Sequence, residues 1–228
     1  LLMTAILTAG LSWRWGYGVL GLVLAGMTLA FTLTRTLWNV APAYDDGHDR
    51  DAPGFRTAIT HPPVWSGIVV FFAYTGLEVA VGQWTYSLLT EARGVTPAMA
   101  GMTVATYWGS FTVGRVIAGI LAGQVQSQIL LRGTLVLAIM GGTLLWVANS
   151  TAGAVVALGV LGAALAPVYP LLMTDTPRRL GDRYAIHAIG FQVAAGYLGA
   201  AAIPGGIGVV AARQGVEVVA PSLLGVAV

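Results

Sequence analysis

Long stretches without charge are the feature that most limits how this chain can fold. Residues 64–89 hold one charged side chain, that of Glu78. Of all 228 residues only 9% are charged and 57% are hydrophobic, with a mean hydropathy of +0.79, whereas soluble domains carry about 25% charged residues. Since the chain lacks the polar residues that a water-exposed surface needs, we expect lipid to surround it.

The apolar stretches have the length of membrane-spanning helices. A helix needs about 20 apolar residues to cross a hydrocarbon core of about 30 Å. We predict an all-α integral membrane protein that crosses the bilayer several times, with spans at 17–33, 64–90, 98–122, 130–148, 153–173 and 186–211. Residues 1–11 and the segment from 215 onward are too short to span, and we interpret both as cut helices.

A polar segment, 34–63, separates the first of these spans from the rest. It holds four of the nine acidic residues, three arginines and four prolines, which is typical of a solvated linker. Alternate connections carry seven arginines on one side of the membrane and three on the other. The positive-inside rule therefore places 34–63 in the cytoplasm. The predicted organisation is one helical part at 1–33, a cytoplasmic linker at 34–63 and a second helical part at 64–228.

Glu78 is the leading candidate for a functional residue. Tyr74 and Thr75 lie within about 60° of it on a helix of 100° per residue, together with two further small or polar residues. A charge that faces lipid costs several kcal/mol, so this stripe should face the bundle interior or a water-filled cavity. The alternative is a structural carboxyl that is held by a neighbouring helix.

The span at 98–122 repeats this pattern. Tyr107 and Ser110 lie on one face with Thr103 and Gly114. Hydroxyl and aromatic groups around a cavity suit a polar, sugar-like ligand, whereas Thr and Ser also serve as ordinary contacts between membrane helices.

Other candidate residues lie later in the sequence. Arg115 should lie about 9 Å nearer the cytoplasm than Glu78, so we expect it to hold helix ends near a gate and not to pair with Glu78. Pro167 and Pro170 should kink their helix. Gln192 and Tyr197 are possible ligand contacts in the last full span.

The sequence has few features of other function classes. It holds neither cysteine nor lysine, and its three histidines do not cluster at metal-ligand spacing. Motifs such as H-E-x-x-H and G-x-S-x-G are absent, as is a basic patch with interleaved aromatic residues. We therefore expect no enzyme, metal, cofactor or nucleic-acid partner.

Four segments resemble the major facilitator superfamily, and most closely its fucose-permease-like, sugar-transporter branch. They are "YTGLEVAVGQW" (74–84), "YWGSFTVGR" (107–115), "APVYPLLMTDTPRRLG" (166–181) and "GFQVAAGYLGAAAIPGGIG" (190–208). The resemblance covers nearly the whole chain. One departure is Gly123 and Gln124, where the signature loop of the family has Asp and Arg.

The resemblance implies an alternating-access transporter in a bacterial inner membrane. The chain would hold the C-terminal six-helix half and the end of the N-terminal half, with the missing half as its partner. The expected cargo is a small polar solute such as a sugar, coupled to protons. The alternatives are an exporter of drugs or metabolites with the same fold, a non-transporting receptor, and a membrane enzyme.

Overall fold

The computed structural model describes residues 2–37, 55–121 and 124–227. The chain divides into two compact units, residues 1–51 and 52–228, and each is described here by itself. Most of the segment interpreted as a linker, residues 38–54, lies outside the described residues.

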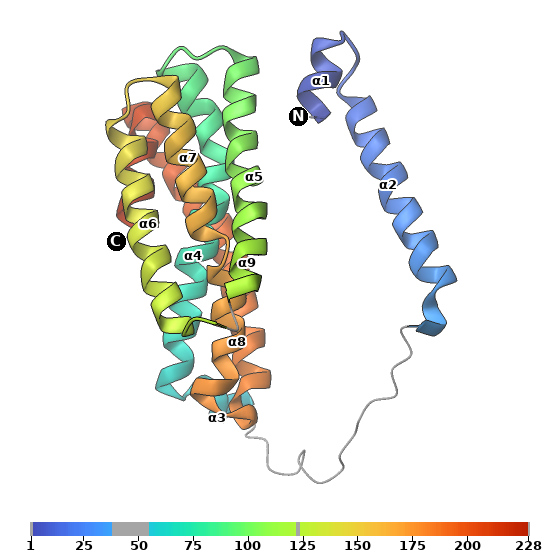
Figure 1. Ribbon diagram of the computed structural model, residues 1–228, viewed down its shortest axis with the longest axis vertical. Helices are drawn as coiled ribbons and strands as arrows, with labels where there is room; N and C mark the ends of the chain where they lie inside the picture. The colour runs from blue at the N-terminus through green and yellow to red at the C-terminus, as the bar shows by residue number, and fades with distance from the viewer. Residues whose placement is uncertain (1, 38–54, 122–123, 228) are drawn as a thin grey trace. The chain divides into compact units, whose positions relative to one another are not determined.

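The first unit consists of two helices joined by a tight turn. Helix α1 (Leu2–Thr8) ends before Gly10, whose φ of 73° is in the left-handed region that glycine adopts without strain. Helix α2 (Arg14–Leu33) follows and passes into the short 3₁₀ turn η1 (Arg35–Leu37) (Figure 1). Its 20 residues match the predicted first span.

The second unit is a bundle of long helices (Figure 1). Its elements are α3 (Phe55–Ile59), α4 (Pro62–Ser87), the π-helical turn η3 (Leu88–Ala92), α5 (Pro97–Leu121), α6 (Ser127–Val147), α7 (Thr151–Leu165), α8 (Val168–Leu180), α9 (Asp182–Gln214), the 3₁₀ turn η4 (Val216–Val218) and α10 (Val219–Ala227).

Six helical segments of the described chain are long and apolar enough to cross a membrane, one in the first unit and five in the second. All six coincide with predicted spans, so the predicted all-α membrane fold is confirmed. The expected connection at 174–185 is mostly helical, because α8 continues to Leu180 and α9 begins at Asp182. Gly181, with φ 74°, is enough to separate the two helices.

Local sequence explains where several helices begin. Pro62 and Pro97 occupy the first positions of α4 and α5, where the missing N–H costs no hydrogen bond. The Ser150 side chain caps α7 by accepting a hydrogen bond from the Gly153 N–H at 3.1 Å.

The span at 151–180 breaks in its middle. Helix α7 ends at Leu165, and α8 begins at Val168. Pro167 and Pro170 have no N–H to donate, so the backbone ladder cannot run through this point. The break confirms the kink that the two prolines predict, and it places Tyr169 at the start of a separate helix.

Close packing of α4 on α9 depends on glycine. A Cβ atom on Gly199 would lie 2.0 Å from the Phe72 carbonyl oxygen, and one on Gly76 would lie 2.4 Å from Ile203. Membrane helices use small residues in this way because packing, not water exclusion, drives their association. These two glycines therefore set the distance between the helices that carry Glu78 and Tyr197.

Arg93 ties three helix ends together at one end of the bundle. Its guanidinium donates to the backbone oxygens of Leu145 (2.9 Å) and Ala148 (3.0 Å) and pairs with Glu217 at 3.1 Å. The carbonyls at a helix C-terminus have no intrahelical partner, so Arg93 satisfies groups that would otherwise be unpaired.

Replacing Arg93 with alanine should lower the melting temperature of the purified full-length protein. The substitution leaves two carbonyl oxygens at the end of α6 without their donor, and each unpaired buried group costs about 1–3 kcal/mol. Arg213→Ala is the matched control, because Arg213 is an exposed arginine at the end of α9. Equal melting temperatures for the two variants would contradict the role assigned to Arg93.

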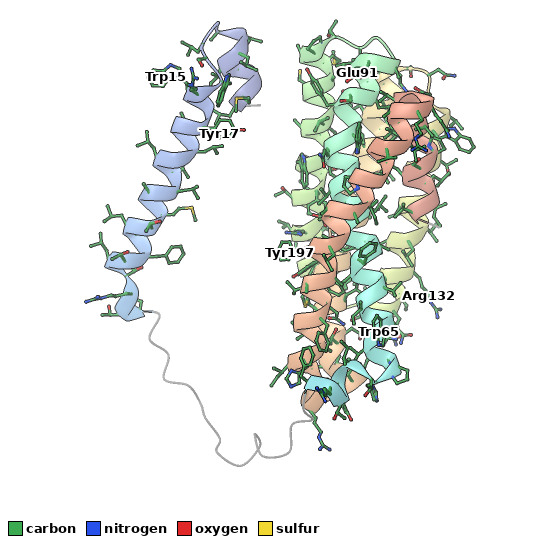
Figure 2. The ribbon with its side chains drawn as sticks, turned by 180° about the vertical axis from the view of Figure 1, so that it is seen from behind. Trp15, Tyr17, Trp65, Glu91, Arg132 and Tyr197 are labelled. Carbon is green, nitrogen blue, oxygen red and sulfur yellow. The ribbon has the colours of Figure 1, made fainter. Side chains whose placement is uncertain are left out.

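The predicted orientation can be tested by labelling one position before α4 and one after it. Figure 2 shows Trp65 and Arg132 towards one end of the bundle and Glu91 at the other. Cysteines at the exposed positions Thr57 and Thr96 should react with a membrane-impermeant maleimide from opposite sides, Thr57 from the cytoplasm. Labelling of both from one side would contradict the predicted topology.

Candidate functional site

A cavity of about 420 Å³ opens between α4, α5, α8 and α9. This volume lies in the range of small-molecule pockets. Its lining residues are Thr75, Glu78, Arg115, Tyr169, Pro170, Val193, Gly196 and Tyr197. The cavity thus combines one carboxyl, one guanidinium, a hydroxyl and two tyrosine side chains within an otherwise apolar bundle.

Glu78 and Tyr74 lie one helical turn apart on α4 and form a hydrogen bond. The Tyr74 hydroxyl donates to Oε2 of Glu78 and also lies 3.1 Å from the backbone oxygen of Leu165, the last residue of α7. Tyr74 is buried, with 6% of its surface exposed. The structure therefore places Glu78 on the cavity wall and Tyr74 behind it.

Thr75 has a buried hydroxyl oxygen without a hydrogen-bond partner among the residues that the structure describes. This is unusual within the bundle, because Thr85, Thr103 and Thr176 each donate to the carbonyl four residues earlier. A Cβ atom on Gly196 would lie 3.0 Å from Thr75 Oγ1, so the small residue leaves this hydroxyl its space. An unpaired polar atom in a cavity wall is a natural contact for a ligand or a water molecule.

Arg115 lines the same cavity as Glu78. No ion pair joins the two side chains among the described residues, in keeping with the expectation that they do not pair directly. The Arg115 guanidinium lies 4.6 Å from the centre of the Phe111 ring, a cation–π contact. A gating role for Arg115 stays a prediction.

Tyr107 and Ser110 lie in the contacts between α5 and its neighbours. Tyr107 is 1% exposed, and its hydroxyl donates to the backbone oxygen of Glu78 at 3.0 Å. Ser110 donates to the Tyr107 backbone oxygen at 2.9 Å, next to Gly162 of α7. Both side chains lie outside the cavity lining, and of the two only Tyr107 contacts Glu78.

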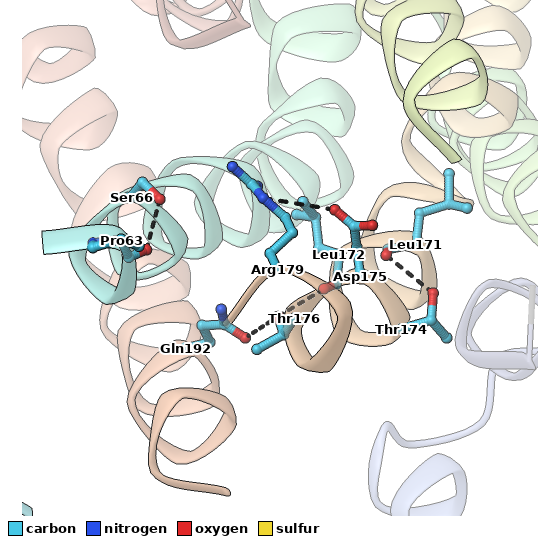
Figure 3. Close-up of polar contacts among 9 residues, drawn as sticks. All are labelled: Pro63, Ser66, Leu171, Leu172, Thr174, Asp175, Thr176, Arg179 and Gln192. Carbon is cyan, nitrogen blue, oxygen red and sulfur yellow. Dashed lines mark hydrogen bonds and ion pairs between the residues drawn. The ribbon is translucent and has the colours of Figure 1, made fainter. Parts of the chain in front are cut away.

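Gln192 directly precedes Val193 of the cavity wall on α9 but does not line the cavity itself. It is 3% exposed, and its Oε1 accepts a hydrogen bond from Thr176 at 3.1 Å (Figure 3). A smaller space of about 270 Å³ adjoins this pair and is also lined by Ser66 and Arg179. Arg179 lies 3.8 Å from Asp175, one turn away on α8. The structure thus places Gln192 beside Thr176 and outside the lining of the cavity that holds Glu78.

Tyr169 and Tyr197 give the cavity its aromatic walls. Tyr197 is 75% exposed, and Figure 2 shows it on the side of the bundle. Tyr169 packs edge-on against Phe71, with ring centres 5.3 Å apart. Sequence reasoning named Tyr197 and missed Tyr169. The sequence feature that could have pointed to Tyr169 is its position between Pro167 and Pro170, because a tyrosine at a helix break can turn into a cavity.

No group of three or more His, Asp or Glu residues that could hold a metal ion occurs in the described segments. The chemistry that the cavity itself offers is hydrogen bonding, aromatic stacking and charge.

An apolar bundle of spanning helices around a polar cavity defines a multi-pass integral membrane protein whose site lies among its helices. The model of the Major Facilitator Superfamily matches residues 1–204. The chain therefore belongs to this superfamily, a family of membrane transporters.

A curated relative is "Bypass of stop codon protein 6" of Saccharomyces cerevisiae. The chain is 26% identical to it over 179 residues, which cover 73% of this chain and 35% of the yeast protein. The chain thus spans about a third of the length of that relative.

Proposed function

We propose that the complete protein is a secondary active transporter that moves a small polar solute by alternating access. The observation that carries this proposal is the cavity itself, in which Glu78, Arg115 and the unpaired Thr75 hydroxyl meet two tyrosine side chains. Membership of the superfamily supports the transport activity. Buried charge inside a membrane protein is costly and commonly marks a transport path.

A sugar is the solute that we propose. Tyrosine rings can stack on the apolar faces of a sugar, while Thr75, Glu78 and Arg115 offer hydrogen-bond partners for its hydroxyl groups. Proton coupling is part of the same proposal, with Glu78 as the residue that carries the proton. We also propose that the missing N-terminal half forms the opposite wall of the transport path and that the protein lies in the bacterial inner membrane.

Uptake by the full-length protein in proteoliposomes tests this proposal. A panel of radiolabelled monosaccharides, amino acids and organic acids is offered under an imposed pH gradient, acid outside. We expect a sugar to accumulate and a protonophore to abolish the accumulation. Accumulation of no solute would contradict the proposal, and extrusion of apolar dyes instead would favour an exporter of the same fold.

A further inference from the structure

The Tyr74 hydroxyl has one proton and two neighbours that can accept it. Its oxygen contacts Oε2 of Glu78 and lies 3.1 Å from the backbone oxygen of Leu165. A backbone oxygen only accepts hydrogen bonds, and so does an ionised carboxylate. Both contacts are hydrogen bonds at the same time only if Glu78 is protonated and donates its own O–H to the Tyr74 oxygen.

The Leu165 end of this contact lies where the membrane span breaks. Leu165 is the last residue of α7, so its carbonyl belongs to the terminal group that lacks intrahelical partners. Helix α8, which begins at Val168, carries Tyr169 and Pro170 into the cavity wall. A hydrogen bond from Tyr74 to Leu165 therefore holds α4 to the junction between α7 and α8, which positions Tyr169 and Pro170 in the cavity wall.

We propose that Tyr74 is the residue that converts the protonation of Glu78 into movement at the α7–α8 break. We call the hydrogen bond from the Tyr74 hydroxyl to the Leu165 oxygen the Tyr74 tie. With Glu78 protonated, the carboxyl donates to Tyr74 and the tie is made. With Glu78 ionised, the Tyr74 hydroxyl donates its hydrogen bond to the carboxylate and no longer to the Leu165 oxygen, because hydrogen bonds to charged acceptors are about twice as strong as neutral ones.

The proton count balances in this scheme. The proton that binds Glu78 comes from cavity water, while the Tyr74 proton stays on its own oxygen and only turns from one acceptor to the other. The charged or titratable side chains near Glu78 on the elements packed around it are Arg115 and Tyr107 from α5, Tyr169 from α8 and Tyr197 from α9. Tyr107 contacts the backbone oxygen of Glu78, at 3.0 Å, which accepts in either state.

This inference rests on the proposed function, because it takes Glu78 as the proton carrier of a transporter. It predicts opposite behaviour for two substitutions. Tyr74→Phe removes the hydroxyl and should leave the tie broken at every pH. Glu78→Gln keeps an N–H₂ group that donates to Tyr74, so the tie should be made at every pH.

Paired spin labels measure the tie without any substrate. Cysteines at the exposed positions Val69 on α4 and Thr174 on α8 can be labelled in the full-length protein once any cysteine outside these 228 residues, which hold none, is replaced by serine. We expect the distance distribution of the parent protein to shift between acid and alkaline pH. Tyr74→Phe should lose this shift and keep the alkaline distribution, and Glu78→Gln should lose it and keep the acid one.

Tyr107→Phe is the matched control, because it removes another buried hydroxyl that is bonded to Glu78 but has only one acceptor. It should keep the shift of the parent protein. A normal shift in Tyr74→Phe, or an alkaline distribution in Glu78→Gln, would overturn the inference. If the shift is present but no solute accumulates in proteoliposomes, the proposed function fails and the tie stands.

Discussion

The Glu78→Gln variant of the full-length protein should exchange solute across the membrane but fail to accumulate it. Glutamine keeps the size of the side chain and its hydrogen bond to Tyr74 but cannot bind and release a proton. A gradient of one pH unit supplies about 1.4 kcal/mol per proton, enough for about tenfold accumulation. We expect the parent protein to approach this ratio and Glu78→Gln to stop near equal concentrations on the two sides.

Proteoliposomes with labelled solute inside and outside separate the possible outcomes. Glu91→Gln is the control, because Glu91 is an exposed acid beyond the end of α4 and should leave accumulation unchanged. If exchange is lost together with accumulation, Glu78 contacts the solute and does not carry the proton. Normal accumulation in the variant would leave a structural role for the carboxyl.

Of the single substitutions proposed here, Gly199→Val should lower the stability of the bundle most. The new Cβ atom would lie 2.0 Å from the Phe72 carbonyl oxygen, and this neighbour is backbone, which cannot turn aside. Overpacking of this kind costs about 1–3 kcal/mol and more where nothing yields. Since α4 and α9 would have to move apart, the cavity between them should also change shape.

The measurement is the melting temperature of the purified variant together with its yield after extraction in detergent. Gly205→Val provides the control, because a Cβ atom at this position of the same helix meets no described atom within 4 Å. The two substitutions change helix propensity alike and differ in packing alone. A similar fall in both melting temperatures would show that packing on Phe72 is not the cause.

The order of the spans and the position of the break could be predicted because they depend on local chemistry. Apolar segments of sufficient length must be helical in lipid, since an unpaired backbone group there costs several kcal/mol. Pro167 and Pro170 likewise remove two backbone donors within one helical turn, whereas the single prolines Pro177 and Pro204 leave α8 and α9 continuous. The membrane fold and the separation of α7 from α8 therefore follow from composition and proline placement.

Which side chains share the cavity depended on contacts between helices far apart in the sequence. Periodicity placed Tyr107 and Ser110 on one helical face but could not tell whether that face meets a cavity or a neighbouring helix. The structure turns it towards α7, where Gly162 leaves room for Ser110. Arg115 and Glu78 form no ion pair, as their different depths suggested, but only the packing of α4 and α5 shows that both side chains line the same cavity.

By itself, the sequence determined that this protein is a bundle of membrane helices with an acidic residue inside it, because the cost of exposing charge to lipid acts on each helix alone. The tertiary structure alone decided what surrounds that acid. Tyr74 could be paired with Glu78 from their spacing of one turn, but its contact with Leu165 joins residues 91 positions apart. Such a contact exists only once α4 packs against the broken span, since its geometry depends on the distance between two helices and not on either sequence pattern.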